Sequence, residues 1–202
     1  TDPITIEANK VVGSSEGNAF VMADGDFSFK LEASANNPAT DPMEEKVVTN
    51  NKDGFVSFFQ DVEFTEAGTY VYTIHEVAGE RGGITYDDSV YTITVEVTDD
   101  YTTAKLSAAV TVSKDGEEVE AGLAGIAFNN TYNPEQTTAL ISGNKVLDSE
   151  HKALEAGEFT FSISAEEGTP LPEDTTVENT STGMFEFGNI TFTKVGTYKY
   201  VI

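Results

Sequence analysis

The sequence contains no cysteine among its 202 residues. This absence excludes thiol nucleophiles, thioester chemistry and zinc sites built on cysteine. It also excludes disulfides, which many secreted β-proteins use for stability. The protein is therefore either cytosolic or stabilised in some other way.

Basic side chains are also scarce: 11 Lys and Arg stand against 35 Asp and Glu, and the formal net charge is -24. A field of this sign repels nucleic acids and anionic membranes, so we expect no nucleic-acid partner. Its ordinary effect is to keep a protein soluble. The acidic loops Asp24-Gly25-Asp26 and Asp87-Asp88 leave weak calcium binding open. No EF-hand loop occurs, however, and the sequence predicts neither a cofactor nor a dedicated metal site.

Long apolar runs and catalytic motifs are missing too. No segment approaches the roughly 20 apolar residues that span a bilayer, so we expect no membrane insertion. The chain has two histidines, His75 and His151, and no G-x-S-x-G, phosphate loop or zinc spacing. These absences argue against an enzyme with turnover.

What the sequence does contain is a series of short alternating segments rich in Thr, Val, Ile, Phe and Tyr. Gly, Asp and Asn separate them, which is typical of β-strands joined by turns. They span residues 27–33, 54–59, 69–77, 90–97, 105–112 and 125–132. No helical period competes with them, and PMEEKVV (42–48) is at most one helical turn. The pattern predicts an all-β fold, an antiparallel sandwich.

An internal repeat divides the chain. Three segments recur in the same order: NKVV at 9–12 as NKVL at 144–147, GDFSFKLEA at 25–33 as GEFTFSISA at 157–165, and FTEAGTYVYTI at 64–74 as FTKVGTYKYVI at 192–202. We therefore expect a complete β-sandwich domain at 1–133, a polar linker at 134–137, and the N-terminal part of a second, homologous domain at 138–202. Because the second copy breaks off, we expect the chain to be a piece of a longer protein.

Three polar residues interrupt otherwise apolar rows. Alternation along a strand puts Glu76 on the same face as Tyr70, Tyr72 and Ile74. In the same way, Lys10 follows Ile4, Ile6 and Ala8, and Asn130 follows Ile126 and Phe128. Burying any of these groups without a partner would cost several kcal/mol, on the order of 2 to 7.

Each residue alone has an ordinary explanation, because a lysine can snorkel, a glutamate at a strand end can reach water, and asparagine is common in turns. Together the three are mutually reactive. Burial favours the neutral, nucleophilic form of Lys10 and the protonated form of Glu76, which can then bond to an amide oxygen and shuttle protons. The side-chain amide of Asn130 offers an electrophilic carbon. The sequence therefore predicts a covalent amide, an isopeptide bond, between Lys10 and Asn130.

Over residues 4–132 the sequence resembles the isopeptide-forming domains of Gram-positive pilins and surface adhesins, most of all the streptococcal-type major pilin repeat. The similarity is carried by NKVV, DFSFKLEA, GTYVYTIHEVAGERGGITYDDSVYTITVEV and FNNTY. The resemblance implies an immunoglobulin-like sandwich in which Lys10 bonds to Asn130 with Glu76 as catalyst. In the second copy, Lys145 matches Lys10, and counterparts of the glutamate and asparagine are absent from the chain.

The resemblance further implies a structural role outside the cell, in a pilus shaft or adhesin stalk attached to a Gram-positive cell wall. Its implied partners are neighbouring domains or pilin subunits, and it leaves room for a host surface ligand. The alternative is an adhesive module that recognises a host glycan or protein through loops such as 34–53. That loop contains no aromatic residue, which favours the stalk.

Overall fold

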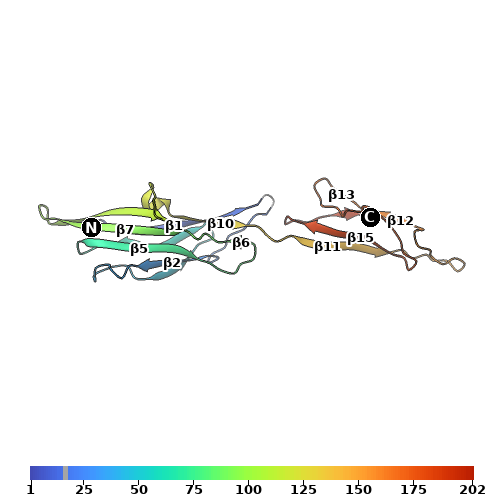
Figure 1. Cartoon of the computed structure of the whole chain (residues 1–202), viewed down its shortest axis with the longest axis horizontal. Coiled ribbons are helices and arrows are strands. Elements are labelled where there is room, and N and C mark those ends of the chain that lie inside the picture. The colour runs from blue at the N-terminus through green and yellow to red at the C-terminus, as the bar shows by residue number, and fades with distance from the viewer. Residues whose placement is uncertain (16–17) are drawn as a thin grey trace. The chain divides into compact units, whose positions relative to one another are not determined.

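The structure, a computed structural model, describes residues 1–15 and 18–202 and contains two compact units. The first unit comprises Thr1–Ser15 and Ala19–Asn133, and the second is formed chiefly by Pro134–Ile202. Strands make up almost all of the regular structure (Figure 1). Within the described residues, the single helical segment is a 3-10 turn at Gly122–Gly125.

The first unit consists of two sheets. One sheet has the strand order β4-β1-β10-β6 and the other has the order β3-β2-β5-β7-β8-β9. The smaller sheet contains β1 (Ile4–Ser14), β4 (Phe55–Val62), β6 (Ile84–Thr85) and β10 (Ala127–Tyr132). The larger sheet contains β2 (Ser28–Ala33), β3 (Lys46–Thr49), β5 (Gly68–Val77), β7 (Val90–Asp100), β8 (Lys105–Lys114) and β9 (Glu117–Glu118).

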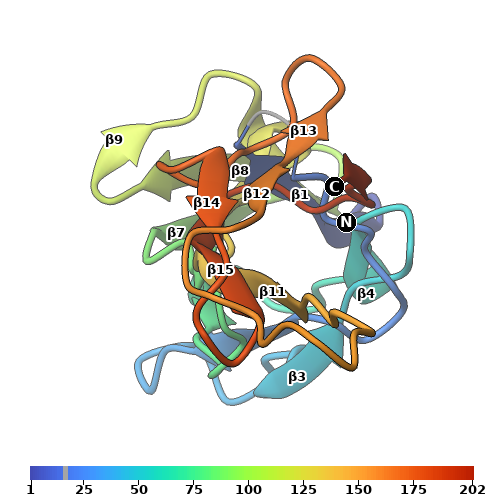
Figure 2. The ribbon, with the colours of Figure 1, turned by 90° about the vertical axis from the view of Figure 1, so that its right-hand side faces the viewer.

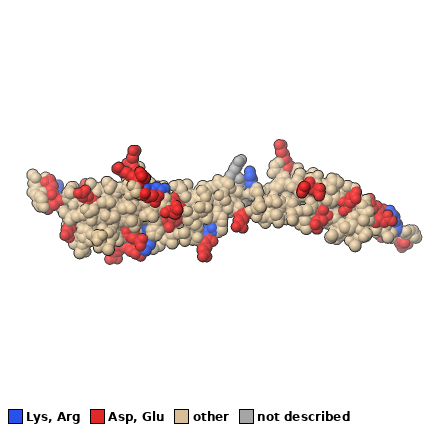
Figure 3. All heavy atoms as spheres, in the orientation of Figure 1, with Lys and Arg blue, Asp and Glu red and all other residues tan. Residues whose placement is uncertain are grey.

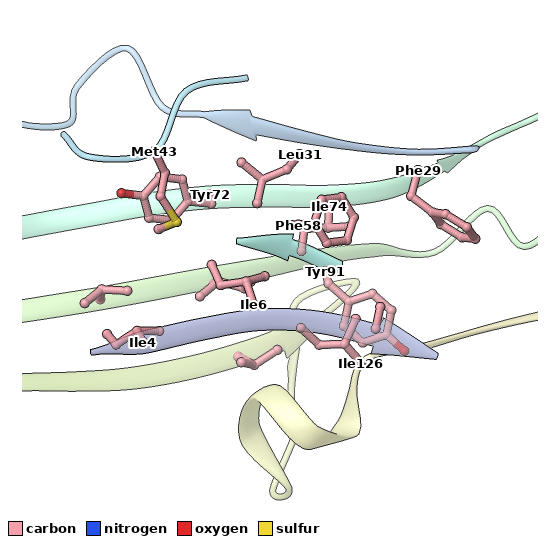
Figure 4. Close-up of a cluster of buried hydrophobic side chains, with 14 of the residues drawn as sticks. Ile4, Ile6, Phe29, Leu31, Met43, Phe58, Tyr72, Ile74, Tyr91 and Ile126 are labelled. Atoms are coloured by element: carbon pink, nitrogen blue, oxygen red, sulfur yellow. The ribbon is translucent and has the colours of Figure 1, made fainter. Parts of the chain in front are cut away.

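One hydrophobic core lies between these sheets. On β5 every second residue is buried, so Tyr70, Tyr72 and Ile74 are fully enclosed while the residues between them are partly exposed. Figure 4 shows side chains of both sheets, among them Ile6 of β1 and Leu31 of β2, converging on this space. Two sheets that share one core confirm the predicted all-β, immunoglobulin-like sandwich.

One strand pair departs from the antiparallel pattern. The first strand of the unit, β1, pairs in parallel with its last long strand, β10, and Lys10 stands opposite Phe128 while Val12 stands opposite Asn130. Tight hairpins cannot join parallel strands, so the chain between β1 and β10 runs through the rest of the sandwich. The pairing therefore makes neighbours of two segments that are far apart in sequence.

The segment 42–48, for which the sequence allows at most one helical turn, contains no helix. Residues Lys46–Thr49 form β3, which pairs with β2 so that Val47 stands opposite Lys30 and Val48 opposite Phe29. The two β-branched valines fit a strand better than a helix, and the edge of β2 offers them a partner. The segment 34–53, considered above as a binding loop, thus contributes a strand to the larger sheet.

The second unit repeats the pairings of the first. Its strands are β11 (Thr137–Asn144), β12 (Thr160–Ser162), β13 (Ser164–Ala165), β14 (Thr176–Glu178), β15 (Met184–Phe192) and β16 (Tyr200–Val201). The pairs β11–β15, β12–β14 and β13–β16 correspond to β1–β4, β2–β3 and β2–β5, and β11 lies beside β15 in Figure 2. Its buried core consists of Ile163, Phe185, Phe187 and Ile190. The tandem repeat is thus present in the structure as well as in the sequence.

Acidic side chains dominate the charged surface of both units, as Figure 3 shows on one face. No helix in the described part of the chain has the length and apolar character needed to cross a membrane.

Candidate functional site

The structure brings Lys10, Glu76 and Asn130 together inside the first unit. Lys10 comes from β1, Glu76 from β5 and Asn130 from β10, so both sheets contribute to the cluster. Their exposed fractions are 3%, 6% and 1% respectively. All three lie on the core-facing rows, as the alternation in the sequence predicts.

Glu76 bridges the other two side chains. Lys10 Nζ donates a hydrogen bond to Glu76 Oε2 at 2.7 Å, and Asn130 Nδ2 donates one to Glu76 Oε1 at 2.8 Å. The amine and the amide nitrogen thus contact the two oxygens of a single carboxylate. A group in this position can take a proton from the amine and give one to the departing nitrogen.

The amide oxygen of Asn130 has a different partner from the one expected. It accepts a hydrogen bond of 2.7 Å from the main-chain N–H of Asp87. The carboxylate of Glu76 contacts the amide nitrogen instead of this oxygen. Because a main-chain N–H can only donate, its contact identifies which end of the Asn130 amide is the oxygen. The donor that polarises the amide is therefore the backbone.

Burial also favours the neutral, nucleophilic form of Lys10. It lowers the pKa of Lys10, because the charged form loses its hydration, although the hydrogen bond and charge of Glu76 and the charge of Asp87 offset part of this effect. The ring centroid of Phe27 lies 4.8 Å from Lys10 Nζ. A lowered pKa increases the fraction of neutral amine, which is the nucleophilic form.

A loop before β4 fixes the backbone around Lys10. The N–H of Lys10 donates to the carbonyl of Gly54 at 2.6 Å, and Gly54 has a φ of +87°. Asn50 accepts a bond from the Phe27 N–H at 2.8 Å and donates to the Ala23 carbonyl at 3.0 Å. These contacts hold Phe27 beside the lysine. Our sequence analysis did not identify Asn50 or Gly54.

A signal for this loop was nevertheless present in the sequence. An asparagine followed four residues later by a glycine occurs at Asn50 and Gly54 and again at Asn179 and Gly183. In the structure Asn179 accepts from the Phe159 N–H at 2.7 Å, as Asn50 does from Phe27. The spacing conserved between the copies could have revealed the loop.

Lys145 has the same backbone setting as Lys10 but fewer partners. Its N–H donates to the Gly183 carbonyl at 2.8 Å, and its Nζ lies 4.4 Å from the ring centroid of Phe159. The repeat matches residues 192–202 to residues 64–74, which stop short of the position of Glu76. In the described residues Lys145 forms no ion pair.

The acidic loops considered for calcium use their oxygens for protein contacts. Asp24 accepts from the Lys52 N–H, Asp26 pairs with Arg81, and Asp87 accepts from the Asn129 N–H. Among residues 1–15 and 18–202, no three His, Asp or Glu side chains are grouped in a way that could hold a metal ion.

Comparisons with known proteins bear on the fold and on the family of the chain. Two variants of the major pilin from Streptococcus pyogenes, one with a glutamate and one with an asparagine replaced by alanine, match the fold with TM-scores of 0.51 and 0.52. Their sequence identities are 17% and 18%, and each match covers 98% of this chain and 81% of the pilin chain. At this identity the match shows a shared fold. No curated protein sequence matches the chain.

The family comparison covers most of the sequence and finds both copies of the repeat. The family model named FctA, described as the Spy0128-like isopeptide containing domain, matches residues 6–133 and again residues 141–202. The chain belongs to this family of isopeptide-containing domains.

Proposed function

We propose that the first unit forms an intramolecular isopeptide bond between Lys10 and Asn130, with Glu76 as proton shuttle. One observation carries the proposal: a single buried carboxylate accepts hydrogen bonds from both Lys10 Nζ and Asn130 Nδ2. A nucleophile, an electrophile and a shared base within hydrogen-bonding reach are what an acyl transfer requires. The reaction occurs once per molecule, so the protein is not an enzyme with turnover.

The reaction is balanced by the groups that are present. Lys10 passes one proton to Glu76, and its neutral Nζ attacks Cγ of Asn130. The new C–N bond forms, Nζ gives up a second proton through Glu76, and the bond from Cγ to Nδ2 breaks. The departing nitrogen receives both protons from Glu76 and leaves as ammonium, which is ammonia plus the proton that made Lys10 charged. The Glu76 carboxylate is regenerated, and no external oxidant or cofactor is needed.

A purely structural ion pair explains the cluster less well. Burying a lysine and a glutamate costs several kcal/mol of desolvation, which their attraction repays only when the geometry and the additional hydrogen bonds are good. Well-packed apolar side chains of similar volume often give a protein equal or greater stability than a buried ion pair. A structural pair would also not require an amide group on the second oxygen of the carboxylate. Conversion to an amide removes the buried charge of the lysine for good.

For the whole chain we propose a structural role in the shaft of a Gram-positive surface pilus or stalk. The family membership and the fold shared with the major pilin from Streptococcus pyogenes support this role. Neighbouring pilin subunits or domains of the same surface protein are the partners that we propose. The absence of cysteine is consistent with this location, because an isopeptide bond supplies the cross-link that a disulfide would supply elsewhere.

Intact-mass measurement tests the proposal. The purified chain should be lighter than its calculated mass by one ammonia, about 17 Da, because each Lys–Asn condensation expels ammonia. A tryptic digest should contain one branched peptide that joins Lys10 to Asn130. The Lys10→Arg variant keeps a positive charge beside Glu76 but lacks the nucleophile, so it should have its full calculated mass. A parent chain of full mass would refute the isopeptide bond.

A further inference from the structure

The amide oxygen of Asn130 accepts a hydrogen bond from a loop that takes no part in the proton transfers proposed for Glu76. The loop connects β6, which ends at Thr85, to β7, which begins at Val90. Its Asp87 N–H donates to Asn130 Oδ1 at 2.7 Å. No side chain among the described residues donates to this oxygen. The main-chain N–H of Asp87 is therefore the group placed to stabilise a negative charge on Asn130 Oδ1.

The side chain of Asp87 determines where this N–H lies. Its Oδ2 accepts a hydrogen bond from the Asn129 N–H at 2.6 Å, which ties the loop to β10 one residue before Asn130. Its Oδ1 accepts from the Ser89 N–H at 2.9 Å and from the Ser89 hydroxyl. The carboxylate is thus bound both to the strand that bears the electrophile and to its own loop. These bonds hold the main-chain N–H of Asp87 and the side-chain amide of Asn130 in a fixed position relative to each other.

An oxyanion forms at this position during the proposed reaction. When Lys10 Nζ bonds to Cγ of Asn130, the electron pair of the C=O bond moves to Oδ1. When ammonia leaves, the pair returns and the amide is restored. A preorganised donor 2.7 to 3.1 Å from such an oxygen lowers the barrier, and removing one typically slows an acyl transfer by a factor of about 100 to 1,000.

We infer that Asp87 completes the reaction centre: its main-chain N–H stabilises the oxyanion on Asn130, and its carboxylate positions that N–H. This inference rests on the proposed isopeptide bond and adds a second acidic residue with a role distinct from that of Glu76. Glu76 handles protons at the two nitrogens, whereas Asp87 serves the oxygen. Asp87 keeps its own charge engaged with Asn129, Ser89 and the nearby Lys114.

The competing explanation is that Asp87 merely orders the loop. Aspartates often accept hydrogen bonds from a main-chain N–H two residues ahead, as Asp87 does from Ser89. A role of that kind would affect the stability of the unit and leave the rate of bond formation unchanged. The two explanations therefore differ in which quantity a substitution alters.

The first test compares Asp87→Asn with Asp88→Asn in the full chain. Asp88 is the exposed neighbour and lies outside the cluster, so its variant changes the same charge without touching Asn130. Each chain is made in a cell-free system, and loss of ammonia is followed over time by intact mass. We expect Asp87→Asn to react at least about 10 times more slowly than the parent and Asp88→Asn to match the parent.

Melting temperatures are measured for both substitutions in the non-reacting Lys10→Arg background. A lower melting temperature for the Asp87 variant together with an unchanged rate in the reactive chain would establish the structural role and overturn the inference. Slow reaction at a melting temperature near that of the Asp88 variant supports it.

The second test removes the donor itself. Incorporating the α-hydroxy analogue of aspartate at position 87 replaces the N–H by an ester oxygen and keeps the carboxylate. The same replacement at Asp88 is the matched control. We expect bond formation to slow about 100-fold at position 87 and to keep the parent rate at 88. Parent kinetics at position 87 would overturn the inference while leaving the Lys10–Asn130 bond intact, whereas a parent chain that never loses ammonia refutes the bond itself.

Discussion

At the scale of single residues, the unreacted site buries two opposite charges, and either charge would be costly without the other. Lys10 and Glu76 have fully buried side chains, so their charges interact in a region without solvent. Removing one partner of such a pair typically costs about 3 to 5 kcal/mol, because the other charge is left buried and unpaired.

Glu76→Gln should prevent the isopeptide bond. Glutamine is nearly isosteric with glutamate but cannot take the proton of the lysine, so we expect the variant to have the full calculated mass. Glu96→Gln is the control, because Glu96 lies on the exposed face of β7 and should lose about 17 Da like the parent. Complete ammonia loss in the Glu76 variant would contradict the shuttle role.

The lowered pKa of Lys10 predicts a pH dependence of stability. Burial, the main cause, makes the folded chain bind the lysine proton more weakly than the unfolded chain, where the pKa is near its ordinary value of 10.5. The unfolded state therefore binds more protons between the lowered pKa and 10.5, and stability rises with pH in that window. Below the window both states are protonated, and the full penalty for burying the charge remains.

This rise can be measured in Asn130→Ala, which keeps Lys10 but cannot form the bond. The free energy of unfolding in urea should increase from pH 7 towards pH 10 relative to the same variant with Lys10→Met. The parent should lack this contribution, because its cross-linked lysine no longer titrates. A difference between the two variants that is flat or falls with pH would argue against a lowered pKa.

At the scale of elements, the loop from Asn50 to Gly54 determines how β1 meets β4. Gly54 combines a φ of +87° with a close approach, since a Cβ at this position would lie 2.2 Å from the carbonyl oxygen of Lys10. Gly183 repeats both features in the second unit, with a φ of +90° and a distance of 2.1 Å from the carbonyl oxygen of Lys145. In both copies, a glycine with positive φ thus packs closely against the backbone of the lysine.

Gly54→Ala should therefore be costly. The methyl group would displace the backbone of Lys10, so we expect a loss of several kcal/mol, on the order of 3, and slower bond formation. Gly116→Ala is the matched control, because Gly116 also has a φ of +90° but open space around its Cβ position. It should cost only about 1 to 2 kcal/mol. Chemical denaturation measures both variants, and equal losses would show that backbone strain alone accounts for the effect.

The sequence predicts the contacts that side chains make better than the contacts that the backbone makes. Lys10, Glu76 and Asn130 were predictable, because strand alternation assigns each side chain to a face without knowledge of the partner strand. The hydrogen bond from the Asp87 N–H to Asn130 was not, because this N–H lies in a loop whose position depends on tertiary pairing. The parallel register of β1 with β10 likewise follows from packing between segments far apart in the chain.

At the scale of the whole molecule, the proposed bond would change the connectivity of the first unit. It would join the first strand to the last long strand, and a loop of roughly 120 residues would be closed between Lys10 and Asn130. By analogy with a disulfide, closing such a loop restrains the unfolded chain and is worth about 5 kcal/mol. Since β1 and β10 already pair, the cross-link would hold together two strands that lie side by side in the fold.

The consequence under mechanical load is the most direct prediction at this scale. Force applied through Thr1 and a residue of the second unit would enter β1, cross the bond from Lys10 to Asn130 and leave through β10. The residues between them would be bypassed. In single-molecule pulling, the parent should therefore show no extension from this segment, whereas Glu76→Gln should add roughly 40 nm of contour length when the unit opens.

Extension of the second unit provides an internal control, because both chains should show it equally. A step of roughly 40 nm in the parent would mean that force travels through the sandwich itself, so that no covalent bond joins Lys10 to Asn130. Its absence in the parent and presence in Glu76→Gln would tie the mechanical behaviour of the chain to one buried carboxylate. The load that the finished bond supports would then explain why a glutamate lies on an apolar row.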